Sequence, residues 1–391
     1  MSVEQQGDGA ELLGAAQAAI ARRDFKAAAA MLARAEAGRP DDVDIKLQVA
    51  LVRRASGDLA GAVSALNSVL AIDPYHFVAM LSKASLVEKL AGGRAAAPLY
   101  RNALDMAPPE ARIPPGLQRP LAHGREVIDQ NAVELEGYLQ KRVAQTRARW
   151  SGESLTRFDE ALSIFAGRKK AYVQEPVMFH YPRLAPIPFH DEALFPWLGE
   201  LEAATDEIRA ELEQALSAGD EGFAPYIAYA PGQPVNQWGE LNHSRRWSSL
   251  WLWKDGVRQD EACAKFPTTT ALLERLPMAR QEGYAPTAMF SALEARTRIP
   301  PHTGSSNTRL LCHLPLVLPG PARFRVGNEV REWRMGKAWV FDDTIEHEAW
   351  NDADELRVIL IFDIWNPLLS QAERELVTAL MAAGRDYYAG D

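Results

Sequence analysis

The sequence predicts an α+β protein in which a region of helical repeats precedes a region of short β-strands. Three prolines near the N-terminus, Pro40, Pro74 and Pro108, recur every 34 residues. From Ala285 onward, short runs rich in aromatic and β-branched residues alternate with Pro-Gly and Asp clusters. Many short strands without long helices between them are typical of a sandwich, a barrel or a jelly roll.

Other positions of the first region repeat with the same 34-residue period. Small residues occupy two fixed places, a large side chain occupies a third, and Asp or Gly marks the turn between paired helices: Ala16, Ala50 and Ala84; Ala28, Ala62 and Ala96; Leu32, Leu66 and Tyr100; Asp24, Asp58 and Gly92. This pattern resembles the tetratricopeptide repeat. Small residues let paired helices approach closely, and proline fits the first turn of a helix, where its missing N–H costs nothing. Residues 7–110 are therefore expected to form three stacked helix pairs.

Stacked repeats of this kind offer a concave surface. We expect it to bind a peptide or protein, and in an enzyme it would recruit the substrate. The alternative is an appendage that only stabilises the chain or makes it dimerise. The sequence does not define the oligomeric state.

Residues 111–175 are predicted to be a helical linker. Prolines interrupt the helical pattern over residues 108–122, so this stretch is expected to be bent. Helical spacing of apolar residues then resumes from about Glu126 to Leu162. The arginines of this part indicate a solvated helical face, with contact to an acidic partner as the alternative.

Residues 176–391 are predicted to be a second domain, with helices flanking its strands. Amphipathic spacing predicts helices over 198–216 and 268–276. Trp247, Trp251 and Trp253 share one parity, which predicts a strand with one aromatic face, ended by the Asp255-Gly256 turn.

Composition narrows the class of protein. The formal net charge of −9 argues against nucleic acid as the main partner. Two cysteines, Cys263 and Cys312, cannot form a disulfide framework and fit a reducing compartment. The N-terminus has no signal-peptide pattern, and no stretch approaches the ~20 apolar residues that span a bilayer. We therefore expect a cytoplasmic protein without a membrane span.

Two histidines in the β-rich region carry the functional prediction. His302 and His347 are 45 residues apart, and Arg357 begins an apolar run ten residues after the second. Histidines on different strands can converge on one metal, and neutral imidazole suits Fe(II). A buried arginine can hold a carboxylate with bidentate geometry.

The surrounding residues resemble the aspartyl/asparaginyl β-hydroxylase family. The first motif is Pro301-His302-Thr303-Gly304 with Asn307, Arg309 and His313-Leu314, and the second is Trp333, Gly336-Lys337, Phe341-Asp342-Asp343, Glu346-His347-Glu348, Trp350 and Arg357. The resemblance covers about residues 238–367. It implies a double-stranded β-helix (jelly-roll or cupin-like) domain and an oxygenase that uses Fe(II), 2-oxoglutarate and O2. Animal members of the family also place tetratricopeptide-like helices before the oxygenase domain.

The resemblance also implies roles for single residues. His302 and His347 would bind iron and be the catalytic residues. The co-substrate would be held by five others: Arg357 and Ser291 at its distal carboxylate, Trp253 and His313 elsewhere in its site, and Arg309 facing the substrate or co-substrate. Asp343 and Glu346 would orient His347 or lie solvated at the surface.

Two positions bear on the pocket. Most such oxygenases have an acidic residue two positions after the first histidine, and this sequence has Gly304 there. The two-histidine iron site of the aspartyl hydroxylases, with a water in the vacated position, agrees with this glycine. Leu311 stands where the family pattern has an arginine, and Arg325 is the predicted substitute. Cys263 lacks the partner cysteine of secretory members.

The predicted reaction is hydroxylation of the β-carbon of an aspartyl or asparaginyl residue in a peptide or protein recruited by the repeats, with release of succinate and CO2. A small metabolite or an acyl chain is the alternative substrate. The alternative of another class is a repeat-based adaptor whose β domain only senses a ligand.

Overall fold

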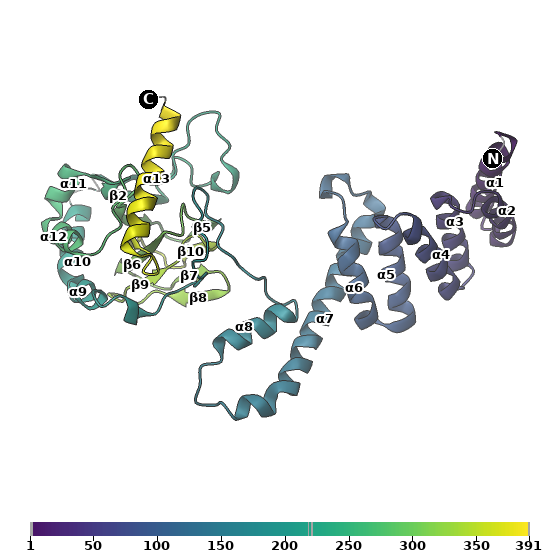
Figure 1. Cartoon of the computed structure of the whole chain (residues 1–391), viewed down its shortest axis with the longest axis horizontal. Coiled ribbons are helices and arrows are strands. Elements are labelled where there is room, and N and C mark those ends of the chain that lie inside the picture. Colours follow the sequence, from purple (N-terminus) through teal and green to yellow (C-terminus); the bar gives the residue numbers. More distant parts are fainter. Residues whose placement is uncertain (1–2, 218, 220–221, 390–391) are drawn as a thin grey trace. The chain divides into compact units, whose positions relative to one another are not determined.

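The computed structural model describes residues 3–217, 219 and 222–389. The chain forms two compact units, residues 1–170 and 171–391. The first is helical and the second contains the sheets (Figure 1).

The first unit contains the three predicted helix pairs. They are α1 (Val3–Ala21) with α2 (Phe25–Gly38), α3 (Val43–Ala55) with α4 (Leu59–Ile72), and α5 (Phe77–Ala91) with α6 (Gly93–Asp105). The second helices of the pairs begin at positions 25, 59 and 93, which reproduces the 34-residue period. The repeated alanines are buried where the helices touch. Asp24 and Asp58 each accept a backbone hydrogen bond at the start of the helix that follows, as N-caps do.

The predicted bend over 108–122 is wrong in its second half. Helix α7 runs from Pro115 to Ala148 and follows the short η1 (Glu110–Arg112). Pro115 fits because it occupies the first turn, where the N–H has no helical partner. Pro120 lies inside the helix. The stretch with helical spacing, from about Glu126 to Leu162, is divided between α7 and α8 (Thr156–Phe165).

Helices border the sheets of the second unit. They are η2 (Glu192–Leu194), α9 (Leu198–Ala203), α10 (Thr205–Ser217), η3 (Asn236–Trp238), α11 (Asp260–Lys265), α12 (Pro267–Arg275) and α13 (Gln371–Ala389). The predicted helix over 198–216 is interrupted at Ala204. Helix α10 packs on α12 and on the large sheet, where it buries Ile208 and Leu212 in an apolar core. No helix among the described residues is long and apolar enough to cross a membrane.

Two antiparallel sheets form the centre of this unit. The larger has the order β1-β2-β4-β11-β6-β9 with β3 beside β2, and the smaller has the order β5-β10-β7-β8. Their strands are β1 (Ala224–Pro225), β2 (Trp247–Lys254), β3 (Val257–Arg258), β4 (Ala288–Leu293), β5 (Thr297–His302), β6 (Arg309–Val317), β7 (Ala322–Val326), β8 (Glu329–Glu332), β9 (Trp339–Phe341), β10 (His347–Asn351) and β11 (Arg357–Trp365). The predicted Asp255-Gly256 turn joins β2 to β3, and both residues have positive φ, as a type I′ hairpin requires.

The large sheet is apolar on both faces. One face packs on the helices through Phe290 and Leu360. The other packs on the small sheet, where Met289 and Ile359 meet Phe324. Cys312 is a buried core residue, and both cysteines are free. The unit is therefore a sandwich of two sheets with one helix-covered face.

A buried amide connects the two sheets. Asn351, at the end of β10 in the small sheet, donates through Nδ2 to the carbonyls of Leu293 and Glu294 at the end of β4, and to that of Glu355. Its Oδ1 accepts from the backbone N–H of Ala353. One side chain thus bonds to the end of β4 and to the loop that joins β10 to β11.

Replacing Asn351 with leucine should lower the free energy of unfolding by about 2–4 kcal/mol, since each buried polar group left without a partner costs about 1–3 kcal/mol. Urea unfolding followed by tryptophan fluorescence measures this, because nine of the ten tryptophans lie in residues 171–391. Gln371→Leu, at an exposed amide of the same unit, is the control and should change stability by less than ~0.5 kcal/mol. Equal effects of the two substitutions would contradict the assigned role.

Candidate active site

Two histidines from neighbouring strands face each other. His302 ends β5, His347 begins β10, and the two are direct partners in the antiparallel register. Their ring centroids are 4.1 Å apart. The register shifts next to this pair, at Pro300 and Pro301. Because proline has no N–H for the ladder, a bulge at this place costs little.

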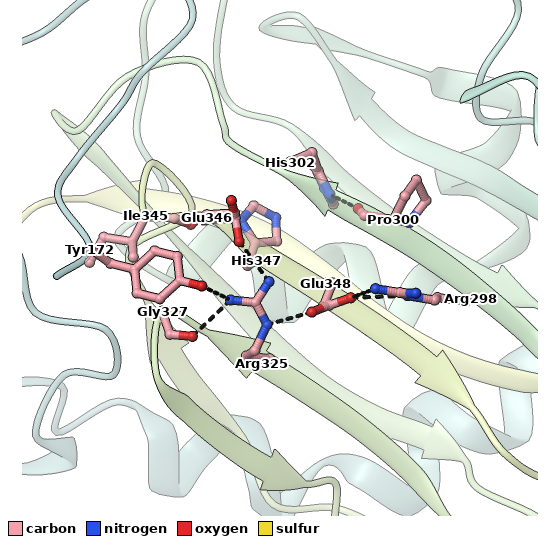
Figure 2. A network of polar contacts seen from close by, with 10 residues as sticks. All are labelled: Tyr172, Arg298, Pro300, His302, Arg325, Gly327, Ile345, Glu346, His347 and Glu348. Carbon is pink, nitrogen blue, oxygen red and sulfur yellow. Dashed lines mark hydrogen bonds and ion pairs between the residues drawn. The ribbon is translucent and has the colours of Figure 1, made fainter. Parts of the chain in front are cut away.

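The hydrogen bonds of the two rings define their tautomers. Nδ1 of His302 lies 2.8 Å from the carbonyl oxygen of Pro300, and Nδ1 of His347 lies 3.1 Å from that of Ile345 (Figure 2). A carbonyl only accepts, so each Nδ1 carries the hydrogen and each Nε2 keeps a lone pair. Burial lowers the pKa of His302 to about 4 and, together with His302, lowers the pKa of His347 well below its usual value. Both imidazoles are neutral at neutral pH, the form that binds metals.

Arg357 is a buried cation that has no acidic partner among the described residues. It begins β11, and its side chain is among the largest fully buried ones, with 1% exposure. In the part of the chain that the structure describes, its Nε and Nη1 have no hydrogen-bond partner. Its guanidinium lies 4.7 Å from the ring of Trp333. Burial lowers the pKa of Arg357 to about 9. A buried cation of this kind is suited to bind an anion.

The histidines and Arg357 line one pocket. Its cavity volume is about 70 Å³. Its wall is mostly apolar and aromatic. Besides the two histidines and Arg357, the wall consists of Ser291, His313, Tyr226, Trp247, Met289, Ile299, Leu311, Phe324, Trp333, Phe341, Ala349, Ile359 and Ile361. Ser291 Oγ accepts from Trp247 Nε1 at 3.2 Å, so its own hydrogen is left to donate. Burial and Arg357 lower the pKa of His313, which is therefore neutral.

Five predicted site residues thus meet in the pocket, and two do not. Trp253 belongs to the core on the opposite, helix-covered face of the large sheet. The register of β2 shifts between Trp251 and Trp253, and this bulge inserts one residue, so Trp253 points away from the face of Trp247. The prediction that the three tryptophans share one face of the strand is wrong for this reason. Trp247 lines the pocket instead.

Arg309 is also placed differently from its predicted role. Its Nη1 donates to Asp363 Oδ2 at 2.6 Å and to the carbonyl of Tyr284 at 3.0 Å, and it does not line the pocket. Asp363 is buried, and its burial raises its pKa to about 6. The ion pair explains the correction, because the charge of Arg309 is already neutralised within the fold.

Arg325 cannot substitute for an arginine at position 311. Its guanidinium donates to Glu346, to Glu348, to the hydroxyl of Tyr172 and to the carbonyl of Gly327 (Figure 2). On β7 the alternate residue, Phe324, faces the pocket. Glu346 is likewise used by Arg325 and does not orient His347, whose Nδ1 is held by a carbonyl.

Gly304 and Asp343 lie against each other beside the histidines. A Cβ on Gly304 would come within 1.8 Å of Asp343 Oδ2. The backbone N–H of Gly304 donates to the carbonyl of Asp343 at 2.7 Å. Burial, with Asp342 nearby, raises the pKa of Asp343 to about 8. The space of a side chain at position 304 is therefore filled by a carboxyl group from the second histidine loop.

Aromatic residues near the histidines were missed in part. The ring of Trp238 lies edge-on to that of His302, with centroids 5.0 Å apart, and Tyr226 stacks on Trp247 at 4.1 Å. The sequence did contain a signal for Trp247, which belongs to the cluster of tryptophans predicted to line one face of a strand. Trp238 and Tyr226 lie outside the regular elements that periodicity detects, and only the fold brings them to the site.

Comparison with known proteins agrees with this arrangement. The family model described as Aspartyl/Asparaginyl beta-hydroxylase matches residues 202–367. The ornithine lipid ester-linked acyl 2-hydroxylase of Rhizobium tropici is 36% identical over 201 residues, which cover 51% of this chain and 67% of that protein. Human aspartyl/asparaginyl beta-hydroxylase is 35% identical over 189 residues, 47% of this chain and only 24% of that protein. Among solved structures, the Sgt2 TPR domain from Aspergillus fumigatus matches with a TM-score of 0.28 and 18% identity, covering 33% of this chain and 82% of the domain.

The family model and the two hydroxylases similar in sequence define the class of this chain as a hydroxylase. The chain belongs to the aspartyl/asparaginyl beta-hydroxylase family.

The contact between Gly304 and Asp343 predicts a non-additive pair of substitutions. Gly304→Ala should destabilise the protein by about 1–3 kcal/mol, as overpacking does, and should cost much less in an Asp343→Ala background. Urea unfolding of the single and double variants gives the interaction free energy. Gly199→Ala is the control, since nothing lies within 4 Å of a Cβ there. Equal costs of Gly304→Ala in both backgrounds would refute the contact.

Proposed function

We propose that this chain is an Fe(II)- and 2-oxoglutarate-dependent hydroxylase. The observation that carries the proposal is Arg357, an unpaired cation buried in the pocket that also holds two neutral histidines. A dicarboxylic acid would place one carboxylate against Arg357 and would bring a metal-binding group to the two histidines. The narrower fold assignment, a double-stranded β-helix, is part of the same proposal.

The donor set fits a metal that brings further ligands with it. Among the described residues, no group of three or more His, Cys, Asp or Glu side chains is arranged to hold a metal ion. His302 and His347 would hold Fe(II) through Nε2, and the co-substrate and water would complete its coordination. When bound, iron and 2-oxoglutarate supply the oxidising chemistry of the reaction.

The balance of that reaction is simple. One atom of O2 enters a C–H bond of the substrate to give an alcohol. The other enters the carboxylate of succinate, as 2-oxoglutarate loses CO2 and is oxidised.

The residues of the chain position and shield these reactants. Arg357 would hold the distal carboxylate of 2-oxoglutarate in a charge-assisted contact, and the hydroxyl of Ser291 would donate to the same group. The carbonyls of Pro300 and Ile345 keep both imidazoles in one tautomer and orientation. The apolar walls exclude water, so the charge of Arg357 acts in a medium of low polarity.

The name of each relative suggests a substrate class. An aspartyl or asparaginyl residue, in a peptide recruited by the helical repeats, is one proposal, and an acyl chain is the other. The adaptor alternative had Leu311 as its support. A domain that only senses an anionic ligand would account for Arg357, but it does not account for the two neutral histidines that face each other in the same pocket.

His302→Ala and His347→Ala should each abolish Fe(II)-dependent formation of succinate from 2-oxoglutarate. Loss of a ligand should exceed the roughly 10–100-fold effect of removing an outer partner. His123→Ala is the matched control, since this half-exposed histidine pairs with Glu88 in the helical unit. Full turnover by either ligand variant would rule out the assigned iron site.

Arg357→Met should remove binding of 2-oxoglutarate without weakening the fold. The pKa of Arg357 is depressed to about 9 in the folded state, so below that pH the buried charge is a penalty that the unfolded chain does not carry. N-oxalylglycine, an inert analogue of 2-oxoglutarate, should raise the thermal midpoint of the wild type and leave that of Arg357→Met unchanged. The variant alone should melt at the same temperature as the wild type or higher.

Arg331→Met is the control for this measurement, because Arg331 pairs with Glu329 outside the pocket. It should keep the shift produced by N-oxalylglycine. A shift retained by Arg357→Met would place the carboxylate elsewhere.

A further inference from the structure

The face of the small sheet that is turned away from the pocket carries a row of ion pairs. On β10, His347 and Ala349 line the pocket, so the side chain of Glu348 between them points to the opposite face. Arg298 of β5 and Arg325 of β7 contact Glu348 on that face, one from each side (Figure 2). The row therefore lies directly behind the histidine pair.

The carboxylate of Glu348 joins three strands. Its Oε2 accepts a hydrogen bond from Arg298 Nε at 3.0 Å, and its Oε1 accepts one from Arg325 Nε. Arg325 is held from its other end by Glu346, to which Nη2 donates at 2.8 Å. The side chain of Glu348 is only 7% exposed, whereas that of Arg298 is 54% exposed. Both oxygens of one buried carboxylate are thus used, each by a different neighbouring strand.

This bridge lies where the backbone ladder between β5 and β10 is interrupted. Two residues of β5, Pro300 and Pro301, stand opposite the single residue Glu348 of β10, which makes a bulge. Neither proline has an N–H, so β5 gives the ladder no donor at this place. The side chains of Glu348 and Arg298 join the two strands here instead. His302 follows the two prolines, and its ring is oriented by the carbonyl of Pro300.

Stability alone does not account for a carboxylate at position 348. The desolvation of a buried ion pair offsets much of its attraction, and apolar side chains of similar volume often stabilise a fold as well or better. A carboxylate between two guanidinium groups adds a defined geometry, because charge-assisted hydrogen bonds are short and directional. Glu348 passes this geometry to its chain neighbour His347 and, across the bulge, to His302.

We propose that Glu348 is a positioning residue for the metal site. By holding Arg298 and Arg325, it fixes the spacing of β5 and β10 at the proline bulge. That spacing sets the separation of the His302 and His347 imidazoles. The proposal rests on the proposed function, in which both imidazoles bind Fe(II). A metal site requires its ligands to be held close to the productive geometry by the groups that support them.

The test measures Co(II) binding to the full-length protein in the presence of N-oxalylglycine, followed by the visible absorption of bound Co(II). Glu348→Gln keeps the size of the side chain but has one acceptor oxygen, and its NH2 group would face one of the two guanidinium groups. We expect the dissociation constant for Co(II) to rise about tenfold, the lower end of the loss seen when a group that orients a metal ligand is removed. The absorption bands of bound Co(II) should shift as well, because the two imidazoles change their relative position.

Arg298→Met removes the same bridge from the side of β5, at a position that is more than half exposed. It should also weaken Co(II) binding. Adding it to Glu348→Gln should cost less than about twofold more, since the two substitutions break one contact. If Glu348→Gln does not fold, Arg298→Met decides the question.

Asp352→Asn is the matched control. It breaks the ion pair of Asp352 with Arg323 at 2.7 Å, which joins β7 to the residue that follows β10, at the end of β10 away from His347. The affinity for Co(II) and the absorption bands should not change in this variant, whatever its free energy of unfolding in urea. Unchanged Co(II) binding by Glu348→Gln and Arg298→Met would overturn the proposal, as would an equal loss in Asp352→Asn.

The wild type and His302→Ala separate this inference from the proposed function. Co(II) binding that His302→Ala leaves unchanged would count against the proposed iron site. Binding that requires His302 but does not respond to Glu348→Gln would count against the role of Glu348 alone. The two failures are therefore distinguishable.

Discussion

The antiparallel pairing of β5 with β10 places His302 directly opposite His347, and the other parts of the site are arranged around this pair. Side chains alternate between the faces of a strand, so a slip of one residue would turn one imidazole away from the pocket. The register is held on the far side of β10, where five consecutive residue pairs join it to β7. Asn351 then ties the end of β10 to the large sheet, which carries Arg357 and Ser291. The distance between the histidine pair and Arg357 is thus built into the packing of the two sheets.

The packing of the two sheets keeps Arg357 buried, at a cost in stability. It lies on β11, between β4 and β6 in the middle of the large sheet, where both neighbours supply apolar residues. A lone buried cation destabilises the unliganded fold, and about 1% exposure leaves it little water. The surrounding core must offset this cost. The site therefore stores affinity for an anion in advance, since ligand binding removes a penalty that the folded chain already carries.

Much of this arrangement follows from the sequence, and the exceptions have physical causes. The 34-residue period predicted the helix pairs, and the short runs rich in aromatic and β-branched residues predicted the strands from Ala285 onward. The histidine and arginine motifs pointed to residues that meet in one pocket. Trp253 was misplaced because a bulge in β2 reverses the face that the alternation assigns to it. Arg309 was misplaced because its acid, Asp363, is 54 residues away. Neither a bulge nor a distant ion pair leaves a local signal.

The arginines in and around the pocket are of two kinds, those that pair with an acid of the protein and one that does not. Arg298, Arg309 and Arg325 each have a carboxylate inside the protein, so their charges serve the fold. Arg357 has none, so its charge serves a ligand. A site that must hold two acidic molecules at once requires two charges of the second kind, and the pocket wall contains one. Leu311 stands where the other would be expected. In the proposed function, this one charge would hold the distal carboxylate of the co-substrate.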